Sequence, residues 1–126
     1  MLKPIPSKIL KSTASVYVCN GVDRYQNQTY DEYTVKRVHC QPTNEIRKTQ
    51  ANTDCTLRGI LFVDAHTSAP FLDWYELLQT AHRNNGDMRV TVTDAKGKEV
   101  GQFTVIGVDA LRDDTDTLHH WEVALV

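Results

Sequence analysis

The sequence lacks any apolar run long enough to cross a membrane, and we expect no secretory leader in its first residues. The lysines near the N-terminus are separated by short apolar stretches that Pro4 and Pro6 interrupt, whereas a secretory signal has a continuous apolar core. We therefore expect the chain to remain in the cytoplasm where it is made, without contact with a membrane.

Cysteine is scarce and its spacing forms no paired motif. Cys19, Cys40 and Cys55 are odd in number, and none of them belongs to a CxxC pair. In a reducing compartment this pattern favours three free thiols over disulfides. A chain of 126 residues can bury roughly two thirds of its unfolded surface, so its core needs neither disulfides nor a metal.

Glycine-rich motifs and an excess of one charge are also missing. The six glycines form no GxGxxG or GxxxxGK[ST] phosphate loop, and there is no GxSxG serine motif. Formal net charge is −2, and the charges interleave except in a basic N-terminus and an acidic stretch from Asp109 to Asp116. Because phosphate binding gains from clustered basic charge, tight nucleic-acid binding is disfavoured, whereas transient contact with DNA is not.

Histidines near the C-terminus come closest to a chemical motif. On a strand His119 would point away from His120, so that only His120 and Glu122 share a face, and metal sites usually need a third ligand. The core face of this strand is expected to hold His119, Trp121, Val123 and Leu125. Neighbouring His39 and Cys40 would also point apart, which disfavours a nucleophile–base pair. We therefore expect no enzyme activity, no metal and no cofactor. A hydrolase or nuclease that uses His120 and Glu122 is the least favoured hypothesis for the function of this chain.

Strand patterns occupy most of the remaining sequence. They cover residues 13–19, 30–40, 57–65, 88–94, 99–108 and 119–126. The first strand is expected to stop at an Asn20-Gly21 turn, and a slipped alternation indicates a bulge at Lys36-Arg37. One helical pattern, ending at Asn84-Asn85-Gly86, contains Phe71, Trp74, Tyr75, Leu78, Ala81 and His82. The prediction is one mainly β domain over residues 1–126, a small β-barrel or sandwich of about six strands with one short α-helix and a long polar loop.

Two segments fit neither pattern. Residues 1–12 contain two prolines and are predicted to form an extended arm, whose aliphatic side chains need a surface on this domain or on a neighbour. These side chains are Leu2, Ile5, Ile9 and Leu10. Residues 41–56 are polar, and so long a loop in a small domain is commonly functional. Its polar side chains include Asn44, Glu45, Arg47, Lys48 and Asp54.

Tyrosines gather in the first third of the chain. Tyr17, Tyr25, Tyr30 and Tyr33 interleave there with Arg24, Lys36 and Arg37. Such a combination is typical of a platform for single-stranded nucleic acid, and equally of half-buried aromatic residues at a subunit contact. The slightly negative net charge favours the subunit contact.

Three stretches of the sequence resemble a known family. They are the opening MLKPIPSKIL, residues 21–43 (GVDRYQNQTYDEYTVKRVHCQPT) and residues 114–126 (DTDTLHHWEVALV). In this order they resemble the minor capsid, head–tail connector proteins of tailed phages that infect Gram-positive bacteria. Residues 66–100 depart from the family pattern, because they carry a helical segment and a longer hairpin.

The resemblance implies a head-completion or stopper protein of the virion, assembled in the host cytoplasm. Such proteins are similar to small β-barrels that form a ring below the portal or adaptor protein, close the DNA channel and dock the tail-terminator protein. On this basis the 41–56 loop would face the channel, in transient contact with double-stranded DNA. The N-terminal arm would lie against the next subunit. The alternative is a single-stranded nucleic-acid-binding β-barrel.

Overall fold

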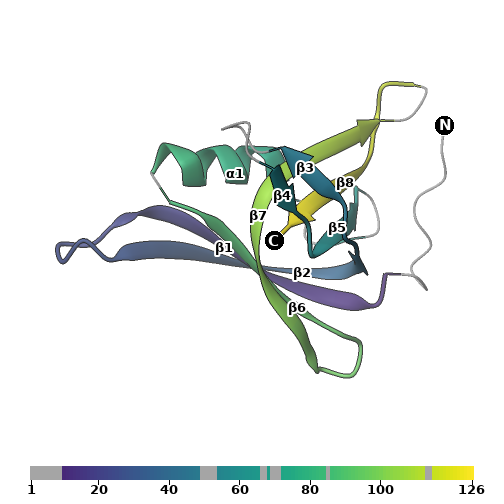
Figure 1. Cartoon of the computed structure of the whole chain (residues 1–126), viewed down its shortest axis with the longest axis horizontal. Helices are drawn as coiled ribbons and strands as arrows, with labels where there is room; N and C mark the ends of the chain where they lie inside the picture. The colour runs from purple at the N-terminus through teal and green to yellow at the C-terminus, as the bar shows by residue number, and fades with distance from the viewer. Residues whose placement is uncertain (1–9, 49–53, 66–67, 69–71, 85, 113–114) are drawn as a thin grey trace.

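The fold was obtained as a computed structural model, which describes residues 10–48, 54–65, 68, 72–84, 86–112 and 115–126 (Figure 1). These residues form eight strands and one helix. In chain order they are β1 (Ser12–Val22), β2 (Gln28–Pro42), β3 (Ile46–Lys48), β4 (Asp54–Thr56), β5 (Gly59–Asp64), α1 (Trp74–Arg83), β6 (Met88–Thr93), β7 (Glu99–Arg112) and β8 (Leu118–Leu125). No helix among them combines the length and the hydropathy that a membrane span requires.

Six of the strands make one closed antiparallel sheet. Its order is β1-β2-β5-β8-β7-β6, and β6 pairs with β1 to close the ring. Strands β3 and β4 form a separate two-stranded sheet. Closure leaves each of the six strands with a partner on both sides, which satisfies the backbone groups that an open edge would expose. The predicted mainly β fold with one short helix is confirmed.

The core lies inside the closed sheet, and the alternation of each strand selects which side chains enter it. Met88, Val90 and Val92 of β6 are fully buried, as the sequence pattern predicts. On β8 the predicted core positions Trp121, Val123 and Leu125 are buried, but His119 is only half-buried. Burying side chains of this size contributes about 1.5–3 kcal/mol each relative to exposure, so the core dominates the stability of the domain.

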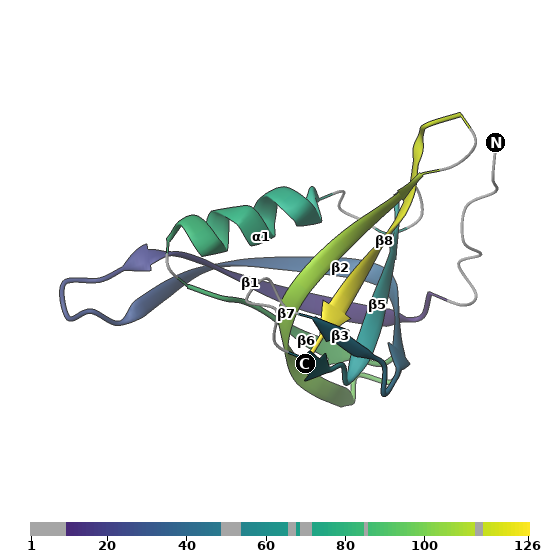
Figure 2. The ribbon, with the colours of Figure 1, turned by 45° about the horizontal axis from the view of Figure 1, so that its top comes forward.

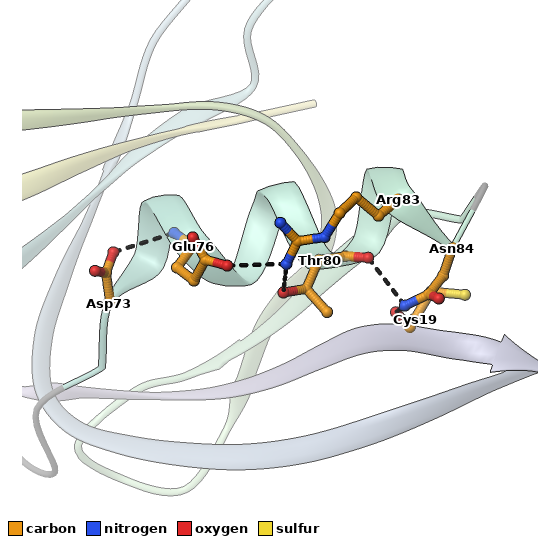
Figure 3. Close-up of polar contacts among 6 residues, drawn as sticks. All are labelled: Cys19, Asp73, Glu76, Thr80, Arg83 and Asn84. Carbon is orange, nitrogen blue, oxygen red and sulfur yellow. Dashed lines mark hydrogen bonds and ion pairs between the residues drawn. The ribbon is translucent and has the colours of Figure 1, made fainter.

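Helix α1 covers part of this core. Asp73 caps its start by accepting a hydrogen bond from the Glu76 N–H at 3.1 Å (Figure 3). Its buried face, Trp74, Leu78 and Ala81, joins the sheet core, and the helix packs against β1, β6 and β7. The helix begins three residues later than the first apolar residue of the predicted pattern, Phe71, which lies outside the described residues.

The C-terminal end of α1 is hydrogen-bonded to β1. The Asn84 side-chain amide donates to the carbonyls of Thr80 and Cys19, at 3.0 and 3.1 Å (Figure 3). Beyond it, a Cβ atom added to Gly86 would lie 2.2 Å from Cys19 Sγ, so only glycine allows the chain to pass this close to β1. The buried Cys19 thiol therefore acts as a packing surface.

Irregular positions in β1 and β2 partly match the sequence prediction. Arg37 has φ of 64° and is the extra residue between pairs Ser12–Val38 and Thr13–Lys36, which confirms the predicted bulge. The predicted turn at Asn20-Gly21 is wrong, because β1 continues to Val22 across a register shift at these residues. Asn20 bonds Asp31 of β2 at 2.9 Å, so its side chain supports strand pairing there.

The described residues of segment 41–56 contain more strand than the predicted loop. Gln41 and Pro42 complete β2, and residues 46–48 pair with 54–56 as the β3–β4 hairpin. Short polar strands carry too little apolar alternation to be recognised in a sequence. Residues 49–53 lie outside the described part of the chain.

The N-terminal arm is described only at its end. Leu10 is 2% exposed within its own chain, whereas a side chain offered to a neighbouring subunit would be exposed in the single chain. The predicted subunit contact at Leu10 is therefore corrected to a contact within the domain. Leu2, Ile5 and Ile9 lie outside the described residues.

Candidate functional site

Large apolar side chains are exposed mainly at the ends of hairpins. The β1–β2 and β7–β8 hairpins extend beyond the closed sheet in different directions (Figures 1 and 2). Val22 and Tyr25 lie at the end of the first, and Leu111 lies near the end of the second. Val100 of β7 is exposed near the turn that joins β6 and β7, whereas the exposed Ile46 lies at the base of the β3–β4 hairpin. Apolar side chains in such positions have few neighbours in their own chain and are available to a partner.

The end of the β1–β2 hairpin has a well-ordered backbone. The Asp23 carboxylate accepts hydrogen bonds from the N–H groups of Tyr25 and Asn27, at 2.8 and 3.0 Å. The Arg24 guanidinium lies 5.0 Å from the centre of the Tyr25 ring, which is 69% exposed. An aspartate turn of this kind fixes the loop without tertiary support, so Tyr25 is presented on a preformed end.

The predicted channel residues are brought together on the β3–β4 hairpin. Asn44, Glu45 and Asp54 are exposed there, while the side chains of Arg47 and Lys48 are outside the described part of the structure. Two backbone hydrogen bonds fix the base of the hairpin, from Leu57 N–H to the Glu45 carbonyl and from Thr43 N–H to the Arg58 carbonyl. Leu57 is itself buried, which anchors the hairpin to the body.

A shallow concavity of about 510 Å³ lies over the outer face of β1, β6 and β7. Across these strands Tyr17 pairs with Arg89, and Arg89 with Thr104. Arg58, from the connection before β5, closes one side and donates to the Gln102 carbonyl at 3.3 Å. We call this feature the arginine concavity; its lining includes Tyr17, Tyr30, Arg58, Arg89, Phe103 and Thr104.

Both arginines of the concavity are held over aromatic rings. The Arg58 guanidinium lies 4.7 Å from the centre of the Phe103 ring, and that of Arg89 lies 5.7 Å from the centre of the Tyr30 ring. Stacking leaves the edges of a guanidinium, with their N–H donors, available to carboxylate or phosphate oxygens. The alternation of β6 places Arg89 on its outer face, but no sequence signal identifies Arg58.

Arg89 is also part of an acidic network. It bonds Asp87 at 2.8 Å, and the Tyr30 hydroxyl donates to the same carboxylate at 2.8 Å. Partial burial acts to raise the pKa of Asp87, but these two hydrogen bonds outweigh it and hold the pKa below its usual range. Burial, followed by the bond to Asp87, raises the pKa of Tyr30. Asp87 therefore neutralises part of the charge of Arg89, and Arg58 is the less compensated cation.

Histidines of β2 and β8 meet on another outer face. The Phe62 ring centre lies 6.0 Å from that of His39 and 6.1 Å from that of His120. His120 Nε2 lies 3.0 Å from a Glu122 carboxylate oxygen, so these two share a face as predicted.

The predicted separation of His119 from His120 is wrong for their rings, whose Nδ1 atoms are 2.7 Å apart. Strand alternation fixes only the Cβ direction, and rotation about the side-chain bonds brings the rings together. Among the described residues no group of three or more His, Cys, Asp or Glu side chains is arranged to hold a metal ion.

The partly buried Cys40 follows His39 on β2, and its side chain packs against the core. Burial raises the pKa of its thiol, which reduces the thiolate fraction at neutral pH. A thiol in this state is a weaker nucleophile than an exposed one.

Comparison of the chain with protein-family models, with curated proteins and with solved structures finds no match.

Proposed function

We propose that the chain is a structural protein of a tailed-phage virion, forming a ring at the head–tail junction that closes the DNA channel and docks the tail. The observation that carries this proposal is the placement of exposed apolar side chains at the ends of hairpins that project from a closed sheet. The sequence resemblance gives the class of assembly, and the projecting hairpins supply surfaces by which copies can contact one another.

Ring formation explains why these side chains are exposed in a single chain. Tyr25 and Val22 are 69% and 54% exposed, and the Asp23 turn holds them in position. A rigid aromatic residue on a preformed end loses little conformational entropy on binding, and aromatic residues often dominate interface energies. Contacts between different surfaces of adjacent copies close into a ring when the rotation between copies is suitable.

The β3–β4 hairpin is the element we propose for the channel. Its polar residues Asn44, Glu45 and Asp54 are exposed, and its base is fixed by hydrogen bonds to the body. A polar lining of mixed charge would let DNA pass, because a strongly basic lining would retain its phosphates.

Cryo-electron microscopy of the virion neck tests this function, with filled and emptied particles compared. Density for a ring of this chain below the portal, with the β3–β4 hairpin facing the lumen, is the expected result. A neck in which the chain is absent would contradict the proposal.

A pair of tyrosine variants tests the hairpin contact within the same particles. Tyr25→Ser is expected to lower the yield of complete, infectious particles by about tenfold, because an interface anchor is lost. Tyr75→Ser is the matched control, since Tyr75 of α1 is 54% exposed but lies away from the hairpin ends. Equal yields from the two variants would show that the β1–β2 hairpin is not part of the interface.

A second candidate, a single-stranded nucleic-acid-binding β-barrel, is favoured by the arginine concavity. Aromatic rings beside arginines are the usual components of a surface that stacks bases and tracks phosphates. Salt-dependent binding of an oligonucleotide to the purified chain would support this candidate, and its absence would exclude it.

A further inference from the structure

We infer that the arginine concavity is the docking site for the acidic β7–β8 hairpin end of a neighbouring copy of this chain. This inference rests on the proposed ring and names one of its subunit contacts. We define the acidic hairpin end by its described residues Asp109, Leu111 and Asp116.

The two surfaces are complementary in charge. Two arginines face the concavity, and Arg58 makes no ion pair within the described chain. The Asp116 side chain is 91% exposed, and its ion pair with Arg112 is long, at 4.0 Å. A carboxylate brought to a stacked guanidinium can accept two parallel hydrogen bonds, whereas Arg112 donates its hydrogen bond to the Asp116 backbone carbonyl and not to the carboxylate.

The two surfaces also match in their apolar parts. Leu111 is 37% exposed beside these carboxylates, and the concavity contains the Phe103 and Tyr17 rings. A contact that buries Leu111 against these rings adds apolar burial to the charge pairing. Burial of this kind usually supplies more of the affinity, while charge pairing selects the partner.

The geometry requires that the two surfaces come from different copies. The concavity reaches Val126, after the end of β8, whereas Asp116 precedes Leu118 at the start of that strand and Asp109 pairs with Glu122 in its middle. At about 3.4 Å per residue, Val126 is about 27 Å along the strand from Leu118 and about 14 Å from Glu122. The β7–β8 hairpin end and the chain end after β8 lie at opposite ends of that strand (Figure 2), and the concavity reaches Val126 at the second of these ends. A contact between unlike surfaces repeats from copy to copy, as a ring requires.

Charge also favours this occupant over nucleic acid. The chain has a formal net charge of −2, and Asp87 compensates part of the charge of Arg89. Binding to a phosphate backbone needs several uncompensated cations, whereas docking one or two carboxylates needs only the pair present here.

Two complementary variants of the full chain test the contact by analytical ultracentrifugation. Arg58→Glu replaces the less compensated cation of the concavity with a carboxylate and leaves the hairpin end unchanged. The double variant Asp109→Lys with Asp116→Asn removes the two carboxylates of the defined hairpin end and keeps the concavity; asparagine tolerates the φ of 59° at position 116. Circular dichroism and thermal melting establish that both variants are folded. Lys96→Glu, in the exposed turn after β6, is the control for a change of charge alone.

The wild-type chain and the control are expected to self-associate, and each of the two variants to do so at least about tenfold more weakly. An equimolar mixture of the variants is expected to form a one-to-one dimer, because one intact concavity then meets one intact hairpin end. Failure of the mixture to associate, variants that assemble like the wild type, or a wild-type chain that is monomeric at about 1 mM would overturn the inference.

The test separates this contact from the proposed ring. If the neck contains a ring of this chain but both variants assemble like the wild type, the proposed function stands and the contact between concavity and hairpin end is rejected. If a labelled single-stranded oligonucleotide binds the wild-type chain and Arg58→Glu abolishes that binding, the concavity is a nucleic-acid site and the inference is overturned.

Discussion

The region beneath α1 and the hairpin ends differ in the burial of their aromatic side chains. Trp74 is fully buried against the sheet core, while its neighbour Tyr75 and the distant Tyr25 are largely exposed. Beneath α1 the sheet core encloses the Trp74 ring, while its indole N–H has no hydrogen-bond partner in the described part of the chain. At the hairpin ends the chain supplies a rigid backbone and leaves the aromatic surface uncovered. The first region stabilises the single chain, and the second is suited to binding a partner.

The largest expected effect comes from emptying the region beneath α1. Trp74→Ala is expected to lower the free energy of unfolding by about 3–5 kcal/mol, because it removes the contacts of a buried indole and leaves a cavity. Chemical denaturation, followed by circular dichroism, measures the change. Tyr75→Ala is the control, for which we expect less than about 0.5 kcal/mol. Similar losses in both variants would contradict the contrast between the two sides of the helix.

The next effect tests the close approach between α1 and β1. Gly86→Ala is expected to destabilise the chain by about 1–3 kcal/mol, because the added methyl group overlaps Cys19. Gly107→Ala is the matched control, since a Cβ there meets nothing within 4 Å. Thermal melting compares the two, and a Gly86→Ala variant as stable as the control would show that this contact is not tight.

A smaller and local effect is expected at the β1–β2 hairpin end. Asp23→Ala removes the acceptor of two backbone hydrogen bonds and should lower the local opening free energy by about 1 kcal/mol. Hydrogen exchange should increase at residues 22–28 and stay unchanged in β6. Uniformly faster exchange through the core would mean that the hairpin end is coupled to the body.

The smallest effect depends on pH and tests the edge of the arginine concavity. The pKa of Asp87 is lower in the folded chain than its unfolded value near 3.9, so its stabilisation is present at neutral pH. That stabilisation disappears as pH falls from about 4 through the folded pKa. Asp87→Asn is therefore expected to cost roughly 0.5 kcal/mol at pH 7 and progressively less in acid. Urea denaturation at pH 7 and pH 3 measures both values, and a cost that is equal at the two pH values would contradict the assigned ion pair.

Several elements could be predicted from the sequence because their signals are local. Alternation in residues 88–92 identified the buried face of β6, and helical spacing identified Trp74, Leu78 and Ala81. The slipped alternation at Lys36-Arg37 marked a bulge that the positive φ of Arg37 confirms. Each of these signals depends on whether neighbouring side chains share a face, which the backbone geometry of a strand or helix fixes.

Other features could not be predicted because they depend on distant contacts. The Asn20-Gly21 pair has the composition of a turn, yet pairing with β2 carries the strand past it to the Asp23 turn. Local propensity was overridden there by the strand pairing. The β3–β4 hairpin was missed because its strands have three residues each, too few to show a period.

The candidate site also depends on contacts between residues that are distant in the sequence. Arg58 meets Gln102 and Phe103 only because β5, β7 and β8 are neighbours in the closed sheet. The burial of Leu10 likewise depends on the fold around it, and its sequence context gave no indication of which surface it would reach.

The sequence by itself determined which faces of the strands are apolar, where the helix lies and that the domain is mainly β. These properties follow from periods of two and 3.6 residues, which any short window of the chain contains. Only the tertiary structure decided the order β1-β2-β5-β8-β7-β6, the meeting of Arg58 and Arg89 at one concavity and the exposure of Tyr25 beyond the sheet. Closing a sheet joins strands that are far apart in sequence, and the alternation of a single strand carries no information about its partner.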